Sequence, residues 1–154
     1  MDMMRGGFRL RGSTLGQLDI WVCSSRSNGS GRSGATFFSN PGVENLLGVL
    51  KGRYPIVLLS NTNEMHFQHL VERFDVLGLP DRFILSYRIG CSKPDPRIYQ
   101  AAIEAAGYSG DVCVYVDDIP DYVEAASRQG MHGIVFRTAE ELRMDLAALG
   151  LSFE

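Results

Sequence analysis

Residues 112–118 have the sequence Val-Cys-Val-Tyr-Val-Asp-Asp, five apolar residues that end in two adjacent carboxylates. β-Branched and aromatic residues without an interrupting charge predict a strand buried on both faces, as in a parallel sheet. Pro120 then precedes a predicted helix over residues 122–129. Adjacent carboxylates at the end of a buried strand repel each other. We therefore expect Asp117 and Asp118 to hold a cation between them, or one of them to cap the helix.

The composition is that of one globular domain. A chain of 154 residues, 45% of them hydrophobic, is long enough for one domain with a core but not for two domains. The net charge of −3 argues against nucleic acid as the main partner, and no apolar run is long enough to cross a membrane. The three cysteines lack the spacing of a metal site or a disulfide framework, which predicts reduced thiols in a cytoplasmic protein.

The character of the chain changes near residue 41. Residues 1–40 are expected to form an irregular or flexible segment, rich in Ser, Gly and Arg over 24–39, with one possible short strand at 18–23. Residues 41–154 are expected to form the α/β core. They alternate predicted helices with predicted strands at 54–59, 83–85, 112–118 and 133–136. This alternation predicts βαβ units and a parallel sheet.

Polar side chains follow several of these strands directly. Right-handed crossovers place the carboxyl ends of parallel strands along one edge of the sheet, where open α/β sheets bind ligands. Residues at the strand ends should therefore gather at that edge; they are Ser60, Asn61, Ser86, Asp117 and Asp118.

The chemistry of these groups suits a phosphoryl group. Ser60 offers a hydroxyl, Asn61 an amide donor, and Lys93 an ammonium before a helix whose dipole favours an anion. Asp117 and Asp118 offer the oxygen ligands that Mg²⁺ prefers. Together they would neutralise the charge of a phosphoryl group, which is the electrostatic part of phosphoryl transfer. Taken singly, each has a plainer interpretation as a helix cap or a solvated side chain.

Three segments resemble motifs two, three and four of the haloacid dehalogenase superfamily, most closely its sugar-phosphate phosphatase-like members. They are Leu-Leu-Ser-Asn-Thr-Asn at 58–63, Gly-Cys-Ser-Lys-Pro-Asp-Pro-Arg-Ile-Tyr at 90–99, and Val-Asp-Asp at 116–118 with Glu-Ala-Ala at 124–126. The resemblance covers about residues 41–150. It implies a Rossmann-like, three-layer α/β/α fold with a mainly parallel sheet, and a small phosphorylated metabolite as the ligand.

The resemblance also implies a role for each site residue. Ser60 would bind the transferring phosphoryl group, and Lys93 would bridge the phosphate and the attacking nucleophile. Asn61 would contact the substrate. Asp118, with Asp117 beside it, would hold Mg²⁺ as the cofactor.

The departure from this family concerns its first motif. That motif, Asp-x-Asp-x-Thr or a close variant, supplies the nucleophile from the central strand, and no Asp-x-Asp precedes Ser60. The helical cap that related members carry before the second motif also has no counterpart here. If residues 18–23 fill the central strand, Cys23, Ser24 and Ser25 stand where the aspartate belongs, and nothing in reach would activate a serine. If they do not, the sheet has a costly gap.

Several hypotheses follow from this departure. The chain descends from a magnesium-dependent phosphomonoester phosphatase and turns over little or nothing, while still binding phosphate or a sugar phosphate. Alternatively, it is an active phosphatase in which a displaced acid, Asp2 or Asp19, acts. A third hypothesis is a truncated, non-catalytic fragment that only binds phosphate. Dehalogenation is less favoured, because the acidic pair suits a metal that this reaction does not need.

Overall fold

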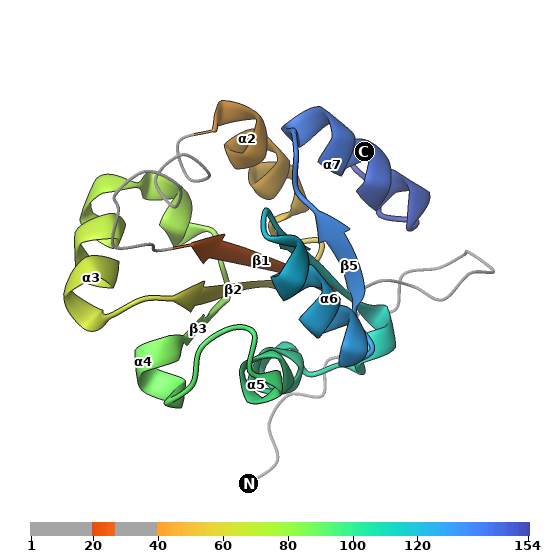
Figure 1. Ribbon diagram of the computed structural model, residues 1–154. Coiled ribbons are helices and arrows are strands. Elements are labelled where there is room, and N and C mark those ends of the chain that lie inside the picture. Colours follow the sequence, from red (N-terminus) through yellow and green to blue (C-terminus); the bar gives the residue numbers. More distant parts are fainter. Residues whose placement is uncertain (1–19, 27–39) are drawn as a thin grey trace, which may run out of the picture.

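A five-stranded parallel sheet forms the centre of the computed structural model, which describes residues 20–26 and 40–154. The strands lie in the spatial order β3-β2-β1-β4-β5, and each neighbouring pair is parallel. They comprise Ile20–Arg26 (β1), Ile56–Asn61 (β2), Arg82–Leu85 (β3), Cys113–Asp117 (β4) and His132–Val135 (β5). Figure 1 shows this sheet between two sets of helices. The predicted α/β class with a parallel sheet is confirmed.

Helices cover both faces of the sheet. The α-helices are Pro41–Leu50 (α2), Glu64–Arg73 (α3), Ser86–Ile89 (α4), Pro96–Ala106 (α5), Pro120–Arg128 (α6) and Ala139–Ala148 (α7). Short 3₁₀ turns lie at Asp75–Gly78 (η1) and Gly110–Val112 (η2). One core packs α2, α3 and α7 against the sheet, and the other packs α5 and α6 against its opposite face. The result is the three-layer α/β/α arrangement.

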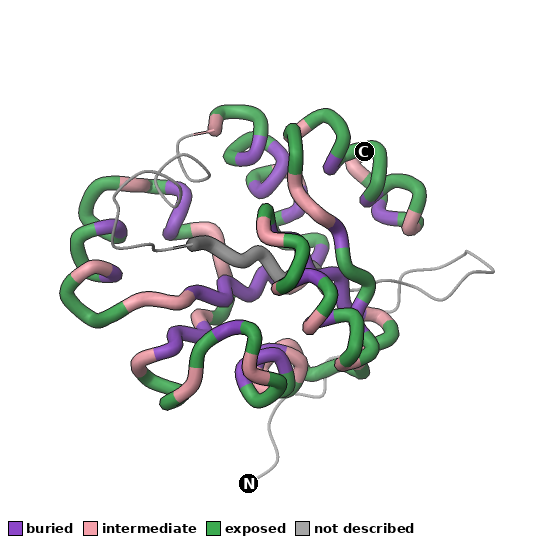
Figure 2. The backbone as a smooth tube through the Cα atoms, in the orientation of Figure 1, coloured by how far each residue is buried: buried purple, intermediate pink, exposed green. Residues whose placement is uncertain are grey.

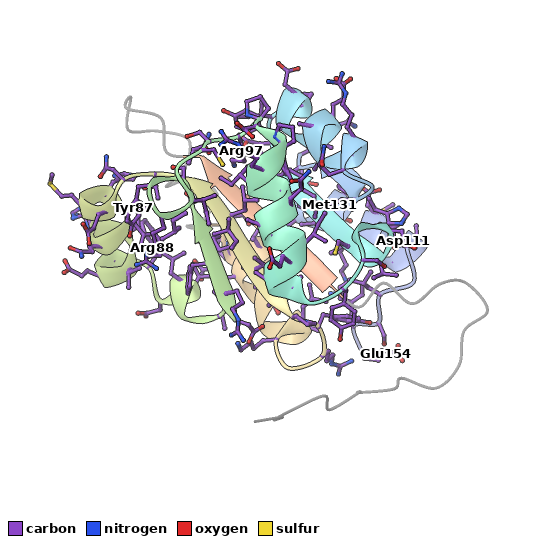
Figure 3. All side chains as sticks on the ribbon, turned by 90° about the horizontal axis from the view of Figure 1, so that it is seen from below. Tyr87, Arg88, Arg97, Asp111, Met131 and Glu154 are labelled. Carbon is purple, nitrogen blue, oxygen red and sulfur yellow. The ribbon has the colours of Figure 1, made fainter. Side chains whose placement is uncertain are left out.

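The inner strands are apolar because they serve both cores. Successive side chains of a strand point to opposite faces. Along β4, Val114 and Val116 join the core beneath α2 and α7, whereas Cys113 and Tyr115 join the core beneath α5 and α6. All five residues of β4 are buried, and Figure 2 shows this purple centre inside a green and pink surface. Figure 3 shows α5 lying across the strands, with Arg97 at its beginning and Met131 beside it.

The strand predicted at residues 18–23 is found at Ile20–Arg26, in the central position between β2 and β4. Trp21 pairs with Ile56 on one side and with Val114 on the other. β1 therefore occupies the central position of the sheet, for which the sequence allowed either a strand or a gap. Residues 1–19 and 27–39 lie outside the described part, so the expected irregular segment and the boundary at residue 40 stay predictions.

Local signals fix the helix ends close to where the sequence places them. The Asn40 side chain caps α2 by accepting a hydrogen bond from the Gly42 amide. The Asp95 side chain caps α5 by accepting a hydrogen bond from the Arg97 amide. Gly107 ends α5 at a φ of 81°, which glycine adopts without a steric penalty. The short helix α4 was not predicted from the sequence. In the described part of the chain, no helix has the length and apolar character needed to cross a membrane.

Candidate active site at the carboxyl edge of the sheet

Lys93 and Asp117 form an ion pair inside the protein. The Lys93 Nζ atom lies 3.0 Å from Asp117 Oδ2, and the two side chains are 0% and 1% exposed. Lys93 belongs to the loop between α4 and α5, whereas Asp117 is the last residue of β4. Two charges removed from water are costly to bury unless further hydrogen bonds satisfy them. The structure supplies such bonds to the Asp117 carboxylate.

Asp117 accepts hydrogen bonds at both carboxylate oxygens. The Tyr115 hydroxyl donates to Oδ2 at 2.7 Å, the oxygen that also faces Lys93, and the Ile119 amide donates to Oδ1 at 3.0 Å. Tyr115 reaches Asp117 because residues two apart on a strand share a face. The predicted magnesium role of Asp117 stays a prediction. The contacts that the structure gives this carboxylate are to protein donors.

Asn61 holds the backbone of Lys93. Its Oδ1 accepts the Lys93 amide at 2.8 Å, and its Nδ2 donates to the Lys93 carbonyl at 3.2 Å. The end of β2 is thereby joined to the loop before α5, which is 32 residues away in the sequence. The substrate contact that the resemblance implies for Asn61 stays a prediction. The observed contacts make this residue a support for Lys93.

Ser60 lies at the end of β2, with only 1% of its surface exposed. The loop that follows it is fixed by Ser86, at the start of α4. The Ser86 hydroxyl accepts the Thr62 amide and donates to the Thr62 carbonyl, each at 2.9 Å. The sequence predicted Ser86 at this edge of the sheet. The structure adds that it orders the backbone just beyond the predicted phosphate-binding serine.

Asp118 directly follows β4 and is exposed. Strand alternation separates it from Asp117, whose side chain turns inward. Within residues 20–26 and 40–154, no three His, Cys, Asp or Glu side chains gather as a ready metal site. A single exposed carboxylate still suits Mg²⁺, because this ion commonly takes one or two carboxylates and completes its shell with water and phosphate oxygens. The exposed Asp118 carboxylate is thus a donor of the type that Mg²⁺ takes.

Two aromatic side chains at this edge were not predicted as site residues. The Tyr122 ring lies 4.9 Å from Lys93 Nζ, a distance at which the ring face attracts an ammonium. Tyr115 could have been found from the sequence, since it stands two residues before Asp117 on the same strand. Tyr122 could not have been found from the sequence, because its contact with Lys93 depends on the position of α6 relative to the sheet.

Tyr99 lies behind these groups, against Tyr115. The two rings meet edge to face, with centroids 5.3 Å apart and planes at 84°. In the described part of the chain, the Tyr99 hydroxyl has no hydrogen-bond partner. Burial raises the pKa of Tyr99, and the charge of Asp117 raises it further. The Tyr115 hydroxyl is close enough to act in the opposite direction on that pKa, but it does not meet hydrogen-bond geometry.

The end of β1 reaches the same edge. Ser25 pairs with Ser60 on β2, and Cys23 pairs with Val116, the residue before Asp117. The register therefore places the backbone of residues 23–25 between the two strands that carry the site. This is where the sequence expected Cys23, Ser24 and Ser25 to replace an aspartate.

These contacts bring three predicted site segments together: the end of β2, the loop before α5 and the end of β4. Hydrogen bonds link Asn61 to Lys93 and Lys93 to Asp117. Ser60 precedes Asn61 in the sequence, and Asp118 follows Asp117. A hollow of about 590 Å³ lies elsewhere, along β5 and α7. None of the five predicted site residues lines it. The predicted site residues thus lie at the carboxyl edge and not in this hollow.

The family described as haloacid dehalogenase-like hydrolase matches residues 28–130, which is more than half of the chain. Phosphatase MT3486 from Mycobacterium tuberculosis is 37% identical over 98 residues, which cover 61% of this chain and 45% of that protein. Flavin mononucleotide hydrolase 1 from Arabidopsis thaliana is 36% identical over 63 residues, which cover 41% of this chain and 26% of that protein. The chain thus spans less than half the length of these curated relatives.

Solved structures show the same fold. An uncharacterized protein from Corynebacterium glutamicum superposes with a TM-score of 0.70 over 89% of this chain and 98% of its own, at 23% identity. The HAD-family enzyme BT-2542 from Bacteroides thetaiotaomicron, in complex with magnesium and inorganic phosphate, superposes with a TM-score of 0.56 at 28% identity. That match covers 61% of this chain and 50% of the enzyme. The predicted Rossmann-like core is confirmed by this likeness.

Proposed function

The chain belongs to the haloacid dehalogenase-like hydrolases, and on that premise we propose that it binds a small phosphate monoester, of the sugar-phosphate type, together with Mg²⁺. The observation that carries the proposal is the hydrogen-bonded link from Asn61 through Lys93 to Asp117. It fixes the backbone of Lys93 and pairs its ammonium with Asp117. The sequence neighbours of Asn61 and Asp117 are a buried serine, Ser60, and an exposed carboxylate, Asp118. Relatives with phosphatase names and a magnesium–phosphate complex of a neighbour support the same chemistry.

Each residue has one task in this proposal. The Ser60 hydroxyl donates to an oxygen of the phosphoryl group, and the Lys93 ammonium offsets its charge. Asn61 keeps the backbone of Lys93 in place, while Asp117 orients the ammonium. Asp118 binds Mg²⁺, which when present would neutralise a further part of the phosphate charge. Because Ser60 and Lys93 are buried, the ligand approaches from the exposed side, where Asp118 lies.

We further propose that turnover is slow or absent. The sequence of β1, Ile-Trp-Val-Cys-Ser-Ser-Arg, contains no carboxylate, and Ser25 is the residue that pairs with Ser60. A serine hydroxyl attacks poorly without a neighbouring base. A displaced acid, Asp2 or Asp19, remains the alternative, and both residues lie outside the described part of the chain.

Calorimetric titration of inorganic phosphate, with and without Mg²⁺, tests this proposal. We expect binding that Mg²⁺ strengthens, and we expect Asp118→Asn to remove the magnesium effect. Asp121→Asn is the matched control, because Asp121 is an exposed acid of the next helix and should leave binding unchanged. Hydrolysis of p-nitrophenyl phosphate, measured on the same samples, should stay near background. Absence of phosphate binding would reject the proposal, and fast hydrolysis would reject the claim of slow turnover.

A further inference from the structure

Tyr115 and Tyr99 are neighbours of the same chemical type with different surroundings. Both side chains are 0% exposed, and their rings touch edge to face. The Tyr115 hydroxyl donates to Asp117 Oδ2, while the Tyr99 hydroxyl has no partner among the described residues. Among the described residues, one hydroxyl of this aromatic pair therefore hydrogen-bonds to the candidate site and the other makes no hydrogen bond.

We propose that Tyr115 is a positioning residue of the phosphate site, which acts through Asp117 to fix the Lys93 ammonium. The inference rests on the proposed function for the identity of the anion. The tyrosine itself does not touch the ligand in this account. It determines the direction in which the ammonium points and how strongly Asp117 attracts it.

The Asp117 carboxylate is fixed in its orientation. Asp117 is held at Oδ1 by the Ile119 amide and at Oδ2 by the Tyr115 hydroxyl, so it cannot rotate without breaking a buried hydrogen bond. A buried carboxylate held in one orientation directs its ion-pair partner to one position. Lys93 Nζ takes that position, 3.0 Å from Oδ2.

Two donors share the negative charge of Asp117. Oδ2 accepts from two donors at once, Tyr115 and Lys93, at 2.7 Å and 3.0 Å. A hydroxyl bonded to a carboxylate stabilises its negative charge and weakens its attraction for another donor. The ammonium then keeps more of its charge for an incoming anion. Removal of the hydroxyl would bind Lys93 more closely to Asp117, at the expense of phosphate.

The Lys93 ammonium has a second contact, with an aromatic ring. The Tyr122 ring lies 4.9 Å from Lys93 Nζ, so an aromatic face and a carboxylate both contact the same group. Tyr122 lies in α6, which follows the strand that carries Tyr115 and Asp117. The strand and its helix thus place the ammonium from two directions, and the Tyr115 hydroxyl is the link that the strand supplies.

The test uses Tyr115→Phe and Tyr99→Phe. Each variant removes one buried hydroxyl and keeps the ring, so the edge-to-face packing is preserved in both. The chain contains two lysines, Lys51 and Lys93, and labelling of lysine with ¹⁵N should therefore give two ammonium signals. The Lys51 side chain is 37% exposed and serves as the internal reference.

We expect Tyr115→Phe to shift the Lys93 ammonium signal and to change its hydrogen-exchange rate by about tenfold, the size expected for a lost hydrogen bond to a charged group. The Lys51 signal should not move. Tyr99→Phe should leave both signals as they are in the unmodified protein. Phosphate affinity in the presence of Mg²⁺ should fall by about tenfold in Tyr115→Phe and by less than about twofold in Tyr99→Phe.

Two results would overturn the inference: a Lys93 signal that Tyr115→Phe leaves unchanged, or equal effects of the two variants. Equal effects of the two substitutions would mean that both tyrosines act on the site only through packing. Failure of the unmodified protein to bind phosphate would instead reject the proposed function. The lysine signals would then still decide whether Tyr115 fixes Lys93, because they are recorded without phosphate.

Discussion

The Lys93 ammonium lies 3.0 Å from Asp117 Oδ2, and almost no surface of either side chain reaches solvent. This pair connects the loop before α5 to the end of β4, which are 24 residues apart in the sequence. Lys93 is also the ammonium that the proposed function assigns to the phosphate. The stability of the fold and the proposed function therefore depend on the same contact.

Replacement of Lys93 by methionine should lower the free energy of unfolding by about 3–5 kcal/mol, because it leaves the Asp117 charge buried without its partner. Lys51→Met is the matched control. It removes an ammonium from a pair with Asp81 in which both side chains are more than a third exposed, and should cost less than about 1 kcal/mol. Urea unfolding measures both losses. Equal, small losses would contradict a buried, poorly solvated pair.

Replacement of Ser86 by alanine should loosen the loop beyond Ser60. The hydroxyl satisfies both the amide and the carbonyl of Thr62, and its loss should cost about 1–3 kcal/mol. Ser127→Ala is the control, because that hydroxyl donates only to Val123 within its own helix. Hydrogen exchange should become faster at Thr62 in the first variant only. Unchanged exchange at Thr62 would show that Ser86 does not order this loop.

Asp95 gives the protein a pH-dependent element at the start of α5. Hydrogen bonds from the Arg97 side chain and the Arg97 amide lower the pKa of Asp95 from 3.8 to about 2. A lowered pKa means that the folded state favours the ionised form. The stabilisation is therefore complete above about pH 5 and is lost progressively as the pH falls towards 2.

Asp95→Asn removes this ionisation and keeps a side-chain oxygen that can cap the helix. The difference in unfolding free energy between the unmodified protein and Asp95→Asn should be constant from pH 7 to about pH 5 and should shrink towards pH 3. Urea unfolding at several pH values measures it. A difference that does not change with pH would contradict the assigned role of the Asp95 charge.

β1 should be among the protected strands. Its backbone pairs with β2 on one side and β4 on the other, so the amides of residues 22–24 are expected to exchange slowly. Edge strands β3 and β5 each pair on one side in the described sheet and should exchange faster. Mass-spectrometric hydrogen exchange on peptides that cover residues 20–26 measures this. Exchange at the rate of an unstructured peptide would show that β1 is not a central strand.

Much of the fold could be predicted from the sequence, because its signals are local. The apolar run before Asp117 is typical of a strand buried on both faces, and β4 serves both cores. Gly107 and Asp95 mark the ends of α5 in the way that glycine and capping residues usually do. The four-residue helix α4 was missed because its sequence, Ser-Tyr-Arg-Ile, has no distinctive pattern.

The candidate site could be predicted only in part. Parallel strands bring their carboxyl ends to one edge, and this places Ser60 and Asn61 at the end of β2 and Asp118 just after β4. The burial of Lys93 and its ion pair with Asp117 could not be predicted, because they depend on the path of the loop before α5. The hydrogen bonds from the Asn61 side chain to the Lys93 backbone could not be predicted either, because they join segments 32 residues apart.

The most direct test of the account is a crystal structure of the protein with Mg²⁺ and inorganic phosphate. We predict one phosphate with oxygens within about 3.2 Å of Ser60 Oγ and Lys93 Nζ. We also predict Mg²⁺ bridging that phosphate to Asp118 at about 2.1 Å. Phosphate bound away from these three side chains, or Mg²⁺ held without Asp118, would contradict the central claim that they form one anion site.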